Sequence, residues 1–286
     1  NTTGHINTAC MLSRDACGET NGDNSTCLDC AGTPNGNAAV DVCGVCNGDN
    51  NTCLDVCGVP NGNGICKVYT NEELTADVDS CFVNAVDHAM CNTISDWDVS
   101  EVSNMDWLFY DTTFNEDISR WNVGKVVLMR YMFRDVQQFN RDISGWNVQR
   151  VVYMNEMFRG AKTFDQDLSA WDVGNVKNMN SLFNDASAFN GDISSWDVSK
   201  VTDTYHMFRY ATSFNQDISN WELTSLTSMS SMFEYASAFN RDLSKWDTSN
   251  VEEMNSVFRG ASAFNQDIST WDVSKTNDMY RMFRDV

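Results

Sequence analysis

The 286-residue chain carries 19 basic and 40 acidic residues, so its formal net charge is −21. Nucleic acids and anionic membrane surfaces bind through lysines and arginines that neutralise phosphate, so this charge argues against both as partners. It attracts cations and basic partners, or simply keeps a secreted protein dispersed. No apolar run approaches the roughly 18 residues of a membrane-spanning helix, so we expect no membrane insertion in this segment.

All eleven cysteines lie between Cys10 and Cys91, and nine of them fall within Cys10–Cys66. This density is typical of small secreted modules that are held together by disulfides. We therefore assign residues 1–66 to a cysteine-rich, irregular segment in which most cysteines are paired.

The same segment holds three N-glycosylation sequons, which begin at Asn1, Asn24 and Asn50. Together with the cysteines they predict an extracellular protein at the cell surface or on an appendage. Two Asn-Gly-Asp-Asn loops place the oxygen ligands that calcium prefers at Asp23 and Asp49. Each loop is too short to supply six ligands alone, so turn formation is the favoured interpretation and a bound Ca²⁺ is the alternative. No cofactor is required.

Residues 67–89 are predicted to form a helical cap. Thr70 and Glu73 have the spacing of a capping box, and apolar residues follow at helical spacing from Leu74. The end of a solenoid needs a lid over its core, and this stretch is placed to provide one. Cys81 and Cys91 are candidates for a disulfide. Since they would lie about 15 Å apart in an unbroken helix, the helix must end between them if they pair.

From residue 90 to residue 286 the sequence consists of eight 25-residue units, the first of which is one residue short. Two aromatic columns keep this register, and the tryptophan of the first unit is Trp97. The phenylalanines are Phe114, Phe139, Phe164, Phe189, Phe214, Phe239 and Phe264. The tryptophans are Trp121, Trp146, Trp171, Trp196, Trp221, Trp246 and Trp271. We expect the tryptophans in the core; a carbohydrate-stacking face is the alternative.

Unit 189–213 shows how each copy divides. Its first half has apolar residues in a short segment flanked by turns, which predicts a brief extended stretch. Its second half has apolar residues at helical spacing, and Ser199 is placed to cap that helix. One extended segment and one helix in every unit predict an α/β solenoid that is leucine-rich-repeat-like.

The repeated strings Asp-Ile-Ser-x-Trp-Asp-Val-Ser-x-Val and Met-x-x-Met-Phe resemble the BspA-like surface-protein repeat, also called the mycoplasma-lipoprotein-type repeat, over roughly residues 71–286. The resemblance implies an extracellular solenoid used in adhesion or surface display, without enzymatic activity. Earlier in the chain, Cys43-Gly-Val-Cys46-Asn-Gly-Asp49 resembles a short cysteine-rich linker repeat of large extracellular proteins.

Two polar columns accompany the aromatic ones. A column of aspartates would stack as like charges, so we expect the carboxylates to accept backbone N–H groups at a corner; a ladder of bound cations is the alternative. A column of asparagines, with Asp165 among them, is expected to link one coil to the next. The aspartates are Asp117, Asp142, Asp167, Asp192, Asp217, Asp242 and Asp267. The asparagines are Asn115, Asn140, Asn190, Asn215, Asn240 and Asn265.

The three histidines, His5, His88 and His206, share no repeat position and form no recognisable catalytic arrangement, so we expect no enzyme. Two functions remain. The favoured one is an extracellular structural subunit of a surface fibre, appendage or coat, which assembles through its solenoid with copies of itself or other surface proteins. It is favoured because no polar cap follows the last unit. The alternative is a cell-surface adhesin that binds a protein or a glycan.

Overall fold

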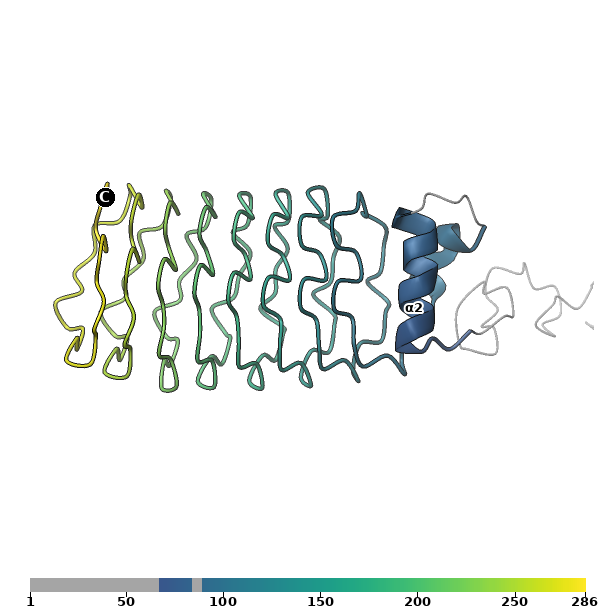
Figure 1. Ribbon diagram of the computed structural model, residues 1–286, viewed down its shortest axis with the longest axis horizontal. Helices are drawn as coiled ribbons and strands as arrows, with labels where there is room; N and C mark the ends of the chain where they lie inside the picture. The colour runs from purple at the N-terminus through teal and green to yellow at the C-terminus, as the bar shows by residue number, and fades with distance from the viewer. Residues whose placement is uncertain (1–66, 84–88) are drawn as a thin grey trace, which may run out of the picture. The chain divides into compact units, whose positions relative to one another are not determined.

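The structure of the protein is a computed structural model that describes residues 67–83 and 89–286. All of these except Lys67 belong to one compact unit, Val68–Val286. Figure 1 shows this unit as a stack of similar coils with helices at its N-terminal end. The described residues contain no helix long and apolar enough to cross a membrane.

The N-terminal end begins with helix α2, Asn71–Val78. The predicted capping box is present, because Thr70 Oγ1 accepts the Glu73 N–H at 3.3 Å and Glu73 Oε2 accepts the Thr70 N–H at 3.0 Å. The chain continues as a π-helical turn, η1 (Asp79–Val83), and later as a 3-10 helix, η2 (Ala89–Asp96).

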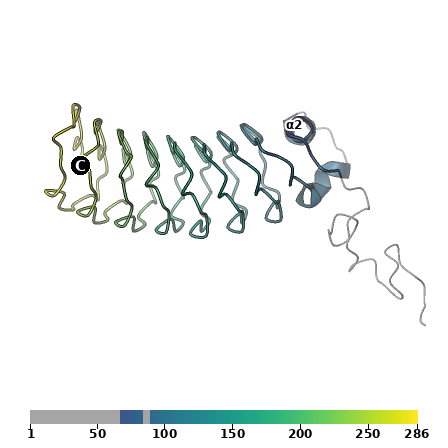
Figure 2. The same cartoon turned by 90° about the horizontal axis from the view of Figure 1, so that it is seen from below.

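Helix α2 is fastened to the first coil by side-chain contacts. Asn71 Oδ1 accepts the N–H groups of Ser103 and Asn104, at 2.9 and 3.2 Å. Just before the helix, the Tyr69 ring stacks on Trp97 with centroids 4.8 Å apart. Figure 1 shows α2 running alongside the segments of the first coil, and Figure 2 shows the helix end-on. The helix therefore covers the first coil as a lid.

Cys81 and Cys91 form a disulfide with Cα atoms 5.5 Å apart. Their separation of ten residues would be far too long in a straight helix. The short distance therefore shows that no unbroken helix joins the two cysteines, of which Cys81 lies in η1 and Cys91 in η2, as the sequence requires for this pair.

The prediction of an α/β solenoid is wrong in its secondary structure. Among the described residues, helices occur only before Trp97, and the coils contain neither a helix nor a regular strand. Ser199, expected to cap a helix, instead donates its backbone N–H to Asp197 Oδ1 at 3.0 Å in a turn. Each coil joins the next through a single parallel bridge. The bridging residues are Asn104, Leu128, Tyr153, Asn178, Asp203, Ser228, Glu253 and Asp278.

The stretch predicted as a helix is a series of turns that we call the turn segment; in the third coil it spans residues 153–161. There the N–H groups of Met157 and Arg159 bond to carbonyls three residues earlier in the same coil. The alternate N–H groups, of Glu156, Phe158 and Gly160, bond to carbonyls of the next coil at 2.7 to 3.0 Å. From Glu156 to Ala161 the backbone N–H groups thus alternate between carbonyls of the same coil and carbonyls of the next coil, so they are satisfied without a helix.

The helical spacing of apolar residues has a different cause in this segment. Met154, Met157, Phe158 and Ala161 are all fully buried, although the backbone is not helical. Glu156, with φ at +57°, lies in the left-handed region and turns the chain between the inward-facing residues. A turn series of this kind places residues i, i+3, i+4 and i+7 on the inner side, which is the pattern that also characterises an amphipathic helix.

The core is an aromatic stack that runs the length of the coils. Within one coil Phe133 and Phe139 lie face to face with centroids 3.9 Å apart, and Phe133 meets Phe158 of the next coil at 5.7 Å. The tryptophans from Trp121 to Trp271 are at most 8% exposed. Each of these indole N–H groups donates to a carbonyl of the preceding coil, as from Trp146 to Ile118 at 3.1 Å. The expectation that the tryptophans form the core is confirmed.

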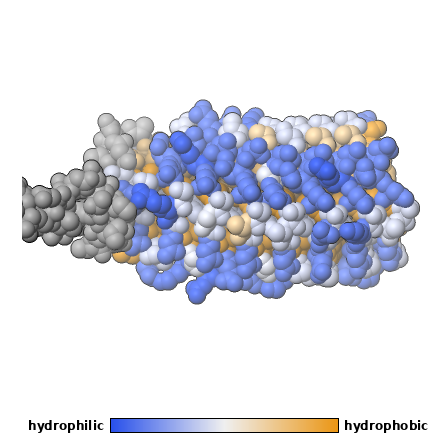
Figure 3. Space-filling view, turned by 180° about the vertical axis from the view of Figure 1, so that it is seen from behind, coloured by the Kyte–Doolittle hydropathy of each residue, from blue (hydrophilic) through white to orange (hydrophobic). Residues whose placement is uncertain are grey.

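The coils are joined a second time along a column that we call the backbone ladder. Here the N–H of each member donates to the carbonyl of the member one coil earlier, at 2.8 to 3.0 Å. The ladder consists of Ser103, Val127, Val152, Lys177, Thr202, Thr227, Glu252 and Asn277. Figure 3, which views the molecule from behind relative to Figure 1, shows that hydrophilic residues cover most of that face and that hydrophobic atoms are visible mainly between them.

Candidate functional site

The aspartate column lies at a corner of each coil. In all seven units the Asp Oδ1 accepts the backbone N–H of the serine two residues later, at 2.8 to 3.0 Å. The hydrogen bonds from the N–H and the hydroxyl of Ser119 hold the pKa of Asp117 below its usual value. For Asp142 the Ser144 hydroxyl and N–H lower the pKa, while repulsion from Asp117 opposes them as a smaller effect. The column thus has the corner role that was the favoured interpretation.

Two further columns repeat this turn chemistry and were not singled out in the sequence. Asp197 Oδ1 accepts the Ser199 N–H at 3.0 Å, and Asp203 Oδ1 accepts the Tyr205 N–H at 2.8 Å. For the column of Asp197 the signal in the sequence was the recurrence of Asp or Asn in nearly every coil. The column of Asp203 gives a weaker signal, because Leu128, Tyr153, Ser228 and Glu253 interrupt it. Among the residues that the structure describes, no group of three or more histidine, cysteine or acidic side chains is arranged to hold a metal ion.

The asparagine column connects successive coils. Asn115 Oδ1 accepts the Asn140 N–H at 3.1 Å, and Asn140 Oδ1 accepts the Asp165 N–H at 3.0 Å. The contact continues through Asp165, whose carboxylate accepts the Asn190 N–H at 2.7 Å. Because only an acceptor oxygen is needed, aspartate replaces asparagine at residue 165 without interrupting the column.

Some predicted sites lie outside the described residues, namely the calcium-loop aspartates Asp23 and Asp49 and the sequons at Asn1, Asn24 and Asn50. They stay predictions. Of the three histidines, only His206 lies in the part of the chain that the structure describes.

The outer side of the turn segments carries exposed aromatic rings and arginines, which we call the aromatic–arginine face. At its N-terminal end Trp107 stacks on Tyr131 with centroids 3.8 Å apart and meets Tyr110 edge-on at 5.0 Å. The Arg134 guanidinium lies over all three rings at 5.5 to 5.9 Å. Trp107 and Tyr110 are 47% and 39% exposed, although large rings are usually buried.

A second aromatic group lies further along the same face. Tyr210 stacks on Tyr235 at 4.8 Å, and Arg209 lies over the Tyr210 ring at 4.7 Å. Between the two groups is a pocket of about 340 Å³. Its lining consists of Asp135, Arg159, Asn184, Asp185, Arg209 and Tyr210.

The arginines of this face are held by carboxylates. Glu234, whose side chain is 5% exposed, bonds to Arg209 at 2.7 Å and to Arg259 at 2.9 Å. It stands where most other coils carry arginine, and its two partners come from the coils on either side. His206 lies near this group, and its pKa is lowered to about 4, mainly by loss of contact with water and then by Arg209. The imidazole is therefore neutral at pH 7.

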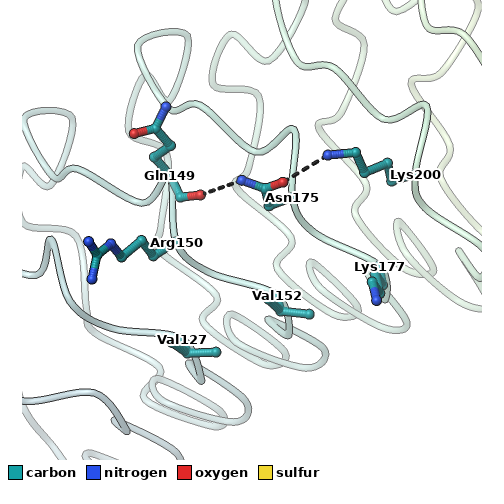
Figure 4. Close-up of a pocket in the computed structure, with 7 residues that line it drawn as sticks. All are labelled: Val127, Gln149, Arg150, Val152, Asn175, Lys177 and Lys200. Atoms are coloured by element: carbon teal, nitrogen blue, oxygen red, sulfur yellow. Dashed lines mark hydrogen bonds between the residues drawn. The ribbon is translucent and has the colours of Figure 1, made fainter.

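A second hollow, the basic groove, lies over the backbone ladder and has a volume of about 530 Å³. Asn175 Nδ2 donates to the Gln149 carbonyl at 2.9 Å, and Lys200 Nζ donates to Asn175 Oδ1 at 2.8 Å. Figure 4 shows these two bonds as one line of contacts across three coils. The groove is lined by Val127, Gln149, Arg150, Val152, Asn175, Lys177 and Lys200.

The repeat also appears in comparisons with known proteins. A family described as "Mycoplasma protein of unknown function, DUF285" matches residues 76–196, 146–239 and 218–286, which together span well over half of the chain. The chain belongs to the DUF285 family. The DUF285 matches overlap, as expected when one family unit aligns with several consecutive repeats, and they cover the region of the mycoplasma-lipoprotein-type resemblance. None of the curated proteins matches this DUF285 chain.

Proposed function

We propose that this DUF285 chain is a non-enzymatic, extracellular recognition protein that binds a protein partner through the aromatic–arginine face. The single observation that carries this function is the exposure of Trp107, Tyr110 and Tyr210 beside arginines on one side of the coil. Tryptophan, tyrosine and arginine are the residues that contribute most to binding energy at protein interfaces.

The rigidity of the face supports this role. Trp107, Tyr131 and Tyr210 all have φ near +60°, and the backbone N–H of each donates to a carbonyl of the next coil. The rings are also ordered by stacking and by the guanidinium groups above them. A surface that is ordered before binding loses little conformational entropy when a partner docks.

An extracellular location is supported by the Cys81–Cys91 disulfide, since such bonds persist in oxidising compartments. The cysteines and sequons before residue 67 point the same way. The resemblance to leucine-rich-repeat-like surface proteins used in adhesion also agrees with a recognition function.

The experiment uses substitutions that the repeat itself already accommodates. Trp107→Ser introduces the residue that occupies the matching positions 181, 231 and 256. Tyr210→Asp introduces the residue that occupies the matching position 185. The backbone has positive φ at all four of these positions, so both substitutions suit the local conformation. Arg141→Gln, at the asparagine corner, is the control because residue 166 of the next coil is Gln. The immobilised chain is exposed to surface proteins of its source cells, and captured proteins are quantified by mass spectrometry.

A specific partner is expected to be captured by the wild-type chain and the Arg141→Gln control, and to be reduced at least tenfold by Trp107→Ser with Tyr210→Asp. Equal capture by all forms would refute the proposed role of this face.

Assembly into a surface fibre is a second candidate, favoured by the continuous aromatic stack. The rings of successive coils stack with nearly constant spacing, as Phe133 and Phe158 do at 5.7 Å and Phe233 and Phe258 do at 5.7 Å. Two subunits placed end to end would make the same contact. Sedimentation velocity over a hundredfold range of concentration tests assembly, because a fibre subunit associates as concentration rises, whereas an isolated recognition protein does not.

A further inference from the structure

The basic groove reverses the charge of the rest of the chain. The formal net charge of the protein is −21, yet the groove is lined by Arg150, Lys177 and Lys200 and by no acidic side chain. The repeat unit does not require basic residues at these positions. At the ladder position of Lys177 the neighbouring coils carry Val152 and Thr202, so the lysine is peculiar to one coil.

None of these three cations forms an ion pair with the described residues. Some basic groups elsewhere on the coils are paired, as Arg209 is with Glu234 and Lys162 is with Asp185, and others, such as Lys275, are not. Arg150 and Lys177 form no ion pair with any of the described residues. Lys200 bonds only to the neutral amide of Asn175. The groove therefore offers positive charge that the protein itself leaves available.

Backbone hydrogen bonds between successive coils hold the base of the basic groove in place. The Val152 N–H donates to the Val127 carbonyl and the Lys177 N–H donates to the Val152 carbonyl, both at 3.0 Å. In the view of Figure 4, Val127, Val152 and Lys177 lie toward the bottom, and Gln149, Asn175 and Lys200 lie above them. Because neighbouring coils are spaced like paired strands, the three cations span on the order of 10 Å along the coil axis. A single small anion does not reach all of them.

We propose that the basic groove binds an acidic oligosaccharide, that is, a sugar chain bearing sulfate or carboxylate groups. The anionic groups pair with Arg150, Lys177 and Lys200, the amides of Gln149 and Asn175 hydrogen-bond to hydroxyls, and the valines contact the apolar face of a sugar ring. Nucleic acid is disfavoured because the groove has no aromatic ring on which a base stacks. A membrane is disfavoured because lipid-binding patches use about four to eight basic residues.

This site is separate from the aromatic–arginine face and does not depend on the function proposed for it. The test is isothermal titration of the full chain with a heparin octasaccharide, with its desulfated, N-acetylated and carboxyl-reduced form as the neutral comparison. The groove variant combines Arg150→Asn, Lys177→Thr and Lys200→Ser. Each new residue already occurs at the matching position of a neighbouring coil, as Asn175, Thr202 and Ser225 do. The variant is therefore expected to fold normally.

The matched control is Lys275→Ser. Lys275 Nζ bonds to Asn250 Oδ1 at 2.7 Å, which repeats the Lys200–Asn175 contact outside the groove. We expect the groove variant to lose at least tenfold in affinity and the control to lose less than twofold. Removal of both the sulfate and the carboxylate charges should abolish binding, and affinity should fall as salt rises from 50 to 200 mM. Trp107→Ser should leave the affinity unchanged.

Equal affinity of the wild-type and groove-variant chains, or equal binding of the neutral octasaccharide, would overturn the proposal. Single-stranded DNA and vesicles of phosphatidylcholine mixed with phosphatidylserine serve as the other anionic probes. If either binds as tightly as the octasaccharide and depends on the same three residues, the groove recognises charge alone and the assignment to sugars is wrong.

Discussion

The ring of Phe82 meets the ring of Phe114 edge-on, with their centroids 5.0 Å apart. This contact joins the helical cap to the first member of the aromatic stack, since Phe114 also stacks on Phe109 at 3.8 Å. The neighbouring Cys81–Cys91 disulfide joins η1 to η2, which directly precedes the coils. The cap therefore closes the stack with an aromatic ring of its own.

Phe82→Ala is expected to loosen the cap and to destabilise the first coil by about 1–3 kcal/mol, below the range for a fully buried phenylalanine because this ring is only partly buried. Each coil contacts mainly its neighbours, so the effect should fade along the stack. Hydrogen exchange should accelerate for the amides of residues 97–110 and not for those near residue 258. Val83→Ala is the control, because Val83 is 58% exposed. Uniform acceleration along all coils would contradict this account.

Replacing Glu234 by glutamine is expected to cost about 2–3 kcal/mol. The buried carboxylate neutralises Arg209 and Arg259, and its loss leaves two positive groups facing a neutral amide. The lower end of the usual range for a broken buried pair applies because both arginines are partly exposed. Urea unfolding measures the change. The exposed Glu222→Gln variant provides the baseline, and the same shift in both variants would show that the ion pairs contribute nothing specific.

Gly260→Ala should destabilise the protein by about 2–4 kcal/mol. Gly260 has φ at +68°, and a Cβ there would overlap the ring of Tyr235 from the preceding coil. The left-handed backbone and the steric overlap both oppose a side chain. Gly145→Ala is the matched control, since a Cβ at Gly145 meets nothing within 4 Å. Thermal melting should separate the two variants clearly, and equal melting temperatures would count against this explanation.

His206 should make stability depend on pH between about 6.5 and 4. Its folded pKa of about 4 lies below the ordinary value, so in this window the unfolded chain binds more protons and stability falls as pH falls. The ring is only half buried, so solvent screening limits the effect to about 1 kcal/mol. The aspartate column does not interfere, because carboxylates with lowered pKa values lose their contribution only below about pH 3.8.

The measurement compares urea midpoints of the wild-type chain and His206→Ser between pH 7 and pH 4.5. Ser231 occupies the matching position with a similar φ, so the variant retains the backbone. The gap between the two chains should change over this interval and be constant above pH 7. Parallel curves throughout would show that His206 does not titrate as described.

The sequence alone determined that the chain forms a repeating coil and which residues fill its core. The constant repeat length places Phe139 on Phe164 and Trp146 beside Trp171, because identical residues at a fixed period stack when each unit packs only on its neighbours. It also located the capping box at Thr70 and the corner role of Asp117, since both depend on contacts within a few residues.

Only the tertiary structure decided the local conformation and the surface sites. Met154, Met157, Phe158 and Ala161 have helical spacing, but hydrogen bonds to the next coil outweigh the helical alternative and hold the chain as turns. The basic groove was equally invisible in the sequence. Arg150, Lys177 and Lys200 are separated by more than twenty residues, and they become neighbours only because the coil returns each of them to the same side of the stack.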